Sequence, residues 1–122
     1  MGFKMKKVMF GAILACAFGL AQADLPTAAQ VQKNMGMGFN IGNTLEVPNN
    51  PEGWGNAFPT QALLDSIKAA GFNTVRLPCA WDSHAPGGKI TETWLDSVKT
   101  VVDFAMRAGL YTVLNIHHEG EG

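Results

Sequence analysis

An internal repeat constrains the fold of this chain more than any other feature of its sequence. The segment AGFNTVRL at residues 70–77 returns 38 positions later as AGLYTVLN at residues 108–115. In both copies a glycine follows a helical pattern and precedes a short run rich in Val, Thr and Leu. Glycine is common just after helices, and β-branched residues favour strands. A helix–strand unit that repeats at this spacing predicts parallel β–α architecture.

The loops between the expected elements differ in a consistent way. Strands are expected at residues 35–42, 73–78 (closed by Pro78) and 110–117, and helices at 24–33, 62–70 and 91–108. The loops after strands are long and rich in Asn, Trp, His and Gly, whereas those after helices are one or two residues. Active sites of (β/α)8 barrels lie in the loops after the strands. This pattern therefore predicts an α/β fold of about three βα units, the N-terminal part of a (β/α)8 TIM barrel. An open doubly wound sheet fits the same order, but no G-x-G-x-x-G motif follows the first strand.

Residues 1–23 have the features of a secretory signal peptide. Three lysines precede an apolar run at residues 8–20, which is too short to span a bilayer as a mature helix. An A-x-A cleavage site ends at Ala23, so we expect cleavage there and a secreted, extracellular mature chain. The alternative is a lipoprotein box, ILAC, in which Cys16 would carry a lipid and tether the protein to a membrane.

Charge and cysteine content narrow the possible functions. Without the signal, which holds three Lys and no acid, six basic residues face ten acidic ones, for a net charge of −4. No Lys/Arg cluster stands out, so we expect no nucleic-acid partner. Cys79 is the single cysteine left after cleavage, which excludes a disulfide within the mature part of this sequence. Beside a strand, a lone cysteine is more often a small buried apolar group than a nucleophile.

Side-chain alternation places several polar residues together. If Leu114 and Ile116 pack on the helices, then Asn115 and His117 point the other way, and Arg76 on the second strand does the same. This arrangement predicts a polar group at the barrel mouth. The equally weighted alternative for Arg76 is a strand-end ion pair with a nearby acid.

Two further interpretations of the C-terminal residues are weaker. His117 and His118 are neighbours on a strand and point to opposite faces, so they are poorly placed to share a metal ion, and we predict no metal site. Glu119 and Glu121 share one face, whereas glycoside hydrolysis requires carboxylates on opposite sides of the scissile bond. We therefore assign neither glutamate as the catalytic acid.

The loops after the strands carry groups that suit sugars. Trp54 and Trp81 offer aromatic faces for sugar rings, and polar neighbours such as Asn43 suit hydroxyl groups. The alternative is that each tryptophan simply anchors its loop. Trp94 lies on the apolar stripe of the last helix and is expected in the core.

Taken in order, these segments resemble a known family. The segments are GFNIGNTLE at residues 38–46, GWGN at 53–56, AGFNTVRLP at 70–78, Trp81, WLD at 94–96 and LNIHHE at 114–119. Together they resemble the N-terminal part of glycoside hydrolase family 5, in particular its bacterial endo-β-1,4-glucanase (cellulase) branch.

The resemblance implies a (β/α)8 glycosidase that hydrolyses β-1,4-linked glucans such as cellulose with retention, using two Glu and no cofactor or metal. It implies that Arg76, at the end of the second strand, supports the nucleophile. It implies that His117 contacts the sugar near the cleavage site, and His118 matches a second His of some branches. Trp81 matches a loop aromatic that can line the cleft. This sequence departs from the family's Asn-Thr-Leu-Asp pattern, because the acidic residue at its last position is Glu46 instead of Asp.

In the family, the acid/base Glu follows strand four and the nucleophile Glu follows strand seven, both beyond this sequence. Residues 24–122 are therefore expected to be the N-terminal portion of a truncated barrel, and the polypeptide expressed alone is expected to be poorly folded and inactive. Alternative functions are a mannanase, xyloglucanase or licheninase of the same family, a non-catalytic carbohydrate-binding module, and an unrelated metal-dependent barrel hydrolase. The polysaccharide, any further modules and the oligomeric state stay open.

Overall fold

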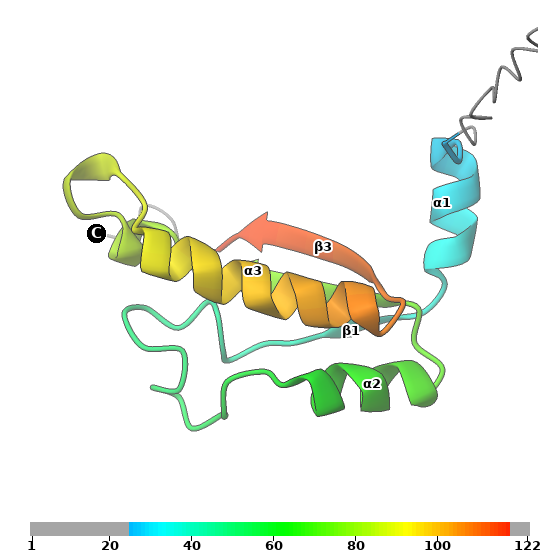
Figure 1. The fold of residues 1–122 in the computed structure, drawn as a ribbon, viewed down its shortest axis with the longest axis horizontal. Coiled ribbons are helices and arrows are strands. Elements are labelled where there is room, and N and C mark those ends of the chain that lie inside the picture. Colours follow the sequence, from blue (N-terminus) through cyan, green and yellow to red (C-terminus); the bar gives the residue numbers. More distant parts are fainter. Residues whose placement is uncertain (1–24, 118–122) are drawn as a thin grey trace, which may run out of the picture.

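The computed structural model describes residues 25–117 as a small layered α/β unit (Figure 1). The elements follow in the order α1 (Ala28–Met35), β1 (Gly38–Asn40), α2 (Gln61–Ala69), β2 (Thr74–Cys79), the 3-10 turns η1 (Asp82–His84) and η2 (Pro86–Gly88), α3 (Glu92–Arg107) and β3 (Tyr111–Ile116). Apart from the two short turns, this is the predicted alternation of helices and strands. None of the described helices has the length and apolar character needed to cross a membrane.

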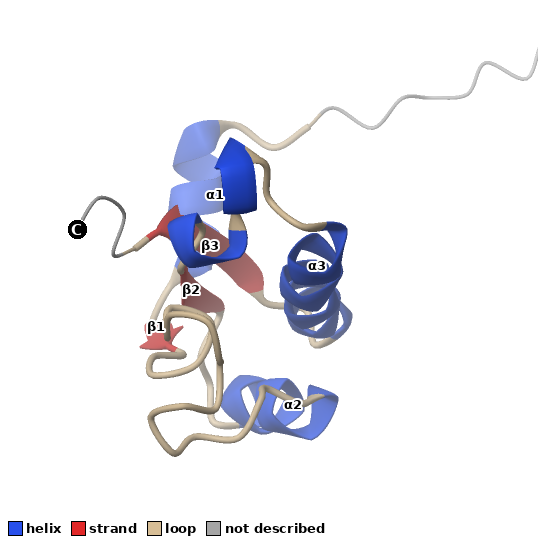
Figure 2. Cartoon of the chain, turned by 90° about the vertical axis from the view of Figure 1, so that its left-hand side faces the viewer, coloured by secondary structure: helices blue, strands red, loops and turns tan. Residues whose placement is uncertain are grey.

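The three strands form one parallel sheet in the order β1-β2-β3. Asn40 of β1 pairs with Arg76 of β2, and Leu77 of β2 pairs with Leu114 of β3. Helices α2 and α3 lie on the same side of this sheet (Figure 2). The repeat in the sequence therefore corresponds to two successive helix–strand units, α2–β2 and α3–β3, as the sequence predicted.

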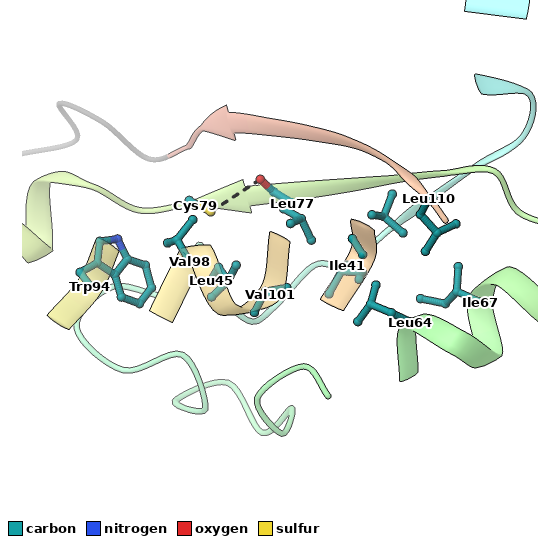
Figure 3. Packing of buried hydrophobic residues seen from close by; sticks show 12 residues of the cluster. Ile41, Leu45, Leu64, Ile67, Leu77, Cys79, Trp94, Val98, Val101 and Leu110 are labelled. Atoms are coloured by element: carbon teal, nitrogen blue, oxygen red, sulfur yellow. Dashed lines mark hydrogen bonds between the residues drawn. The ribbon is translucent and has the colours of Figure 1, made fainter. Parts of the chain in front are cut away.

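The hydrophobic core lies between the sheet and these two helices (Figure 3). Strand β2 contributes three side chains with no exposed surface, Val75, Leu77 and Cys79. Facing them is a set of buried helical side chains: Leu64, Ile67, Trp94, Val98, Val101 and Ala105. The predicted core positions of Trp94 and Cys79 are confirmed.

The helix ends follow the signals in the sequence. The Thr60 hydroxyl accepts a hydrogen bond from the backbone N–H of Leu63 at 3.3 Å, which caps α2 as predicted. Thr91 occupies the N-cap position of α3, although its side chain makes no capping bond. Gly71 and Gly109 follow the two helices with φ angles of 97° and 73°, a left-handed conformation that glycine adopts without steric cost.

The prediction that Pro78 closes the second strand is wrong, because β2 continues through Pro78 to Cys79. The backbone groups of even-numbered residues in β2 face the β1 side, as the bond from Ile41 N–H to the Arg76 carbonyl at 3.0 Å shows. Strand β1 has already ended at Asn40, so no strand on that side requires an N–H from residue 78. Proline is therefore tolerated inside this strand.

The edge strands also differ from the simplest expectation. Strand β1 covers three residues instead of the predicted 35–42. On β3, Leu114 and Ile116 share the helix-facing side with their partners Leu77 and Cys79, yet 44% and 70% of their surface is exposed. Within the described residues, only α3 covers this part of the sheet, and it leaves the outer strand half open.

We predict that Leu77→Ala strongly destabilises the complete enzyme to which this segment belongs. Leu77 is fully buried in the central strand, and truncating such a leucine costs about 2–5 kcal/mol in free energy of unfolding. Leu25→Ala is the matched control, because the Leu25 side chain is 91% exposed. Urea unfolding followed by tryptophan fluorescence measures both variants. Equal effects of the two substitutions would contradict the described core.

Candidate active site

The polar groups of the sheet gather at its carboxyl edge, on the face opposite the helices. Arg76 is half-buried there and pairs in register with Asn40 on one side and Val113 on the other. Its Nη1 donates a hydrogen bond to the Asn40 side-chain oxygen at 2.6 Å. The amide thus fixes the direction of the guanidinium without neutralising its charge. Arg76 has no acidic partner among residues 25–117. The alternative of a strand-end ion pair stays a prediction, because Glu119 and Glu121 lie outside the described residues.

Asn115 and His117 lie on the same face as Arg76, as alternation predicted. Arg76 pairs with Val113 and Pro78 pairs with Asn115, and His117 follows two residues later. The backbone N–H of His117 donates to the Cys79 carbonyl at 2.9 Å, which continues the register beyond β3. Asn115 Nδ2 donates to the carbonyl of Ile116 at 2.8 Å. Predicted residue His118 lies outside the described residues, as do Glu119 and Glu121.

The loop after β1 begins with a tight corner around a buried carboxylate. Asn43 is exposed and has a left-handed backbone, with φ of 57°. Its backbone N–H donates to Glu46 Oε1 at 2.5 Å, and the N–H of Thr44 donates to Glu46 Oε2 at 3.0 Å. Glu46 itself is only 5% exposed. The acid that departs from the family pattern in the sequence therefore organises the backbone of this corner.

Gly42 sits where two polar side chains approach the chain closely. A Cβ atom at this position would lie 2.7 Å from Asn40 Nδ2 and 3.2 Å from Glu46 Oε1. The carbonyl of Gly42 also accepts a hydrogen bond from Asn56 Nδ2 at 3.2 Å, which ties the far end of the loop back to its start. The amide that holds Arg76 and the carboxylate that holds Asn43 thus meet at one glycine.

The two loop tryptophans have different environments. Trp54 is 53% exposed, so about half of its side chain is accessible to solvent. Trp81 is half-buried and packs against the core cluster, which favours a part in anchoring its loop. A role for Trp81 in lining a cleft stays a prediction.

His84 stacks on Trp94 rather than joining the polar edge. Their ring centroids are 3.7 Å apart and their planes differ by 8°. Burial lowers the pKa of His84 below its usual value of 6.5, because desolvation disfavours the charged imidazolium. The imidazole is therefore neutral near pH 7 and behaves as part of the packing around α3.

The environment of Cys79 makes its thiol unreactive. Its thiol is fully buried and donates to the Leu77 carbonyl at 3.7 Å (Figure 3). Burial, reinforced by the negative charge of Glu46, raises the pKa of Cys79 to about 12. A thiol that stays protonated is a poor nucleophile, which supports the interpretation of Cys79 as a core residue.

The described part of the chain contains no ready set of metal ligands. Within residues 25–117, no three His, Cys, Asp or Glu side chains are grouped so that they could hold an ion. What the edge does offer is one oriented cation, several amides and the imidazole of His117. These are hydrogen-bonding groups suited to a hydroxyl-rich ligand and to a carboxylate beside Arg76.

Comparison with known proteins identifies the family. The family model for cellulase (glycosyl hydrolase family 5) matches residues 32–122. Endoglucanase B of Clostridium cellulovorans is 43% identical over 96 residues, which cover 76% of this chain and 22% of that enzyme. The chain therefore belongs to glycosyl hydrolase family 5, and it spans about a fifth of the length of the curated relatives it matches.

Solved structures confirm the fold. A broad-specificity endoglucanase from Clostridium longisporum superposes with a TM-score of 0.74 at 40% identity, covering 80% of this chain and 31% of that one. A xyloglucan-specific β-1,4-glucanase from a ruminal metagenomic library, solved with the ligand XXLG, gives 0.69 at 41% identity, covering 71% and 24%. The parallel sheet and its helices are thus part of a (β/α)8 barrel, as the repeat predicted.

Two residues of the site escaped the sequence analysis. Asn40 has no role of its own in the sequence pattern, and Glu46 stands out there only as a departure from the family pattern. Strand alternation could have placed Asn40 on the face of Arg76, but only the register shows that the two are partners. For Glu46, an acid three residues after Asn43 has the spacing of a side chain that returns to a backbone N–H.

We predict that Cys79 resists alkylation in the native protein. With a pKa of about 12, the thiol is protonated at pH 8 and has no exposed surface. Treatment with iodoacetamide at pH 8, followed by peptide mass mapping, measures labelling of this residue. The same protein in guanidinium is the control and should be labelled fully. Rapid labelling of the native protein would contradict the described burial.

Proposed function

We propose that the complete enzyme to which this segment belongs is a secreted endo-β-1,4-glucanase that retains anomeric configuration. Membership of glycosyl hydrolase family 5 and 43% identity to an enzyme named endoglucanase support this proposal. The observation that carries it at the site is the Arg76–Asn40 pair, an oriented cation at the carboxyl edge of a barrel sheet. In (β/α)8 enzymes that edge is where substrate binds and reacts.

The described residues supply the surroundings of the reaction. Retaining glycosidases use two carboxyl groups about 5–5.5 Å apart, one as nucleophile and one as acid and then base. The resemblance assigns these carboxyl groups to later strands. Arg76 would keep the nucleophile ionised, because a nearby cation favours the charged form of a carboxylate. Asn40 keeps the guanidinium on the barrel side while leaving its positive charge available.

Hydrogen bonding to the sugar is assigned to the neighbouring strand end and loop. His117 is half-buried at the end of β3 on the face of Arg76, where an imidazole can contact sugar hydroxyls. Trp54 is exposed on the loop after β1 and offers a stacking face for a sugar ring. Together these groups match a neutral polysaccharide partner, which has many hydroxyls and alternating apolar ring faces.

Xyloglucan is the second candidate substrate. Its support is specific: a xyloglucan-specific glucanase solved with XXLG shares 41% identity over the aligned part of this chain. The C. longisporum structure is of an enzyme described as a broad-specificity endoglucanase, which favours activity on more than one β-glucan. Mannan and lichenan are alternatives from the sequence that have no such support.

The test measures hydrolysis of a substrate panel by the complete enzyme. We expect release of reducing ends from carboxymethyl-cellulose and xyloglucan. Arg76→Ala should lower kcat/KM by about 10²-fold or more, the usual cost of removing one oriented electrostatic group at an active site. Arg107→Ala, on α3, is the matched control and should leave activity near that of the parent.

Two results would contradict the proposal. One is activity confined to mannan, or no activity on any β-glucan. The other is an Arg76→Ala enzyme that remains as active as the Arg107→Ala control. Loss of all activity on adding EDTA would instead favour the metal-dependent alternative.

We also propose that the enzyme is exported by its first 23 residues. The three lysines, the apolar run and the A-x-A site support cleavage after Ala23, with a lipoprotein at Cys16 as the alternative. Expression of the complete enzyme in a bacterial host, followed by N-terminal sequencing of the medium fraction, is the test. A mature end at residue 24 is expected. Protein retained on membranes with a lipid on Cys16 would replace this proposal by the alternative.

A further inference from the structure

Glu46 is an unusual residue for a loop corner. It is 5% exposed, and it forms no ion pair with any side chain of residues 25–117. Burying a carboxylate is costly unless its oxygens are satisfied by hydrogen bonds. Here both oxygens accept backbone N–H groups, one from Asn43 and one from Thr44. Both oxygens of the carboxylate therefore stabilise the conformation of two consecutive peptide groups.

The conformation that it stabilises is uncommon for residues other than glycine, although asparagine adopts it more readily than most. Asn43 is a non-glycine residue with φ of 57°, in the left-handed region. The corner is also tied to its surroundings, because the Leu45 carbonyl accepts the N–H of Ala80 at 3.0 Å, just after β2. The backbone around Asn43 is thus held on both sides while its side chain remains exposed.

We propose that Glu46 is a positioning residue: its buried carboxylate presents the exposed Asn43 carboxamide at the carboxyl edge of the barrel as a hydrogen-bonding group for the glucan. This inference rests on the proposed function, since it requires a polysaccharide at that edge. A corner needed only for folding could be closed by apolar packing, without a buried charge. An exposed amide on a rigid corner beside the strand ends is what a hydroxyl-rich ligand would use.

The experiment is a double-mutant cycle in the complete enzyme, with carboxymethyl-cellulose as substrate. Asn43→Gly removes the carboxamide and keeps the left-handed backbone, which glycine adopts easily. Glu46→Gln removes the charge and one acceptor oxygen at nearly constant size. Glu92→Gln, at an exposed position in the first turn of α3, is the matched control. KM, kcat and the melting temperature are measured for each variant.

We expect each single variant to raise KM by about 3- to 10-fold, the effect of one hydrogen bond, with a smaller change in kcat. In the Asn43→Gly background, Glu46→Gln should raise KM no further, because both substitutions act through the same carboxamide. Should Glu46→Gln be insoluble, Glu46→Asp takes its place in the cycle, since it keeps both acceptor oxygens on a shorter side chain.

Two outcomes in an active parent enzyme would overturn the proposal. In the first, the single variants leave KM unchanged. In the second, Glu46→Gln multiplies KM by the same factor with and without the Asn43 side chain, as a general loosening of the fold would do. A parent enzyme that hydrolyses no β-1,4-glucan would overturn the proposed function and this inference together. The activity assay of the parent enzyme shows this result before any variant is made.

Discussion

The strict alternation of side chains along β2 is the constraint on which the other features depend. Val75, Leu77 and Cys79 are fully buried against α2 and α3, and Arg76 lies between them on the opposite face. A slip of one residue would place the guanidinium in the apolar core and expose the leucine. The packing of the core therefore determines where Arg76 points. The same strand register that packs β2 against the helices also places the cation on the opposite face.

Local signals in the sequence were enough for most of the fold. Gly71 and Gly109 end two helices because each allows a left-handed backbone at the point where the chain turns back into the sheet. Thr60 caps α2, and Trp94 lies in the core because it belongs to an apolar stripe of helical spacing. Each of these features is announced by a pattern of residues close in sequence, even where, as for Trp94, the packing itself involves distant residues.

The site was less predictable, because its contacts join distant residues. The bond between Arg76 and Asn40 spans 36 positions and exists only once β1 and β2 are in register. Alternation could assign the faces of Arg76, Asn115 and His117, but it could not say which partner each would have. The role of the Glu46 carboxylate was equally hard to predict, because it depends on burial by neighbouring loops.

The proline within β2 has a consequence for the shape of the barrel rim. The β1 chain bonds to Arg76 through the N–H of Ile41 and returns to bond Ala80 through the carbonyl of Leu45. Between these two points, residues 42–44 make a detour beside Pro78, which has no N–H to be left unpaired by the departure. A proline in the middle strand thus removes one donor that would otherwise be left unpaired there, and the first and second strands part at the rim where the Asn43 corner stands.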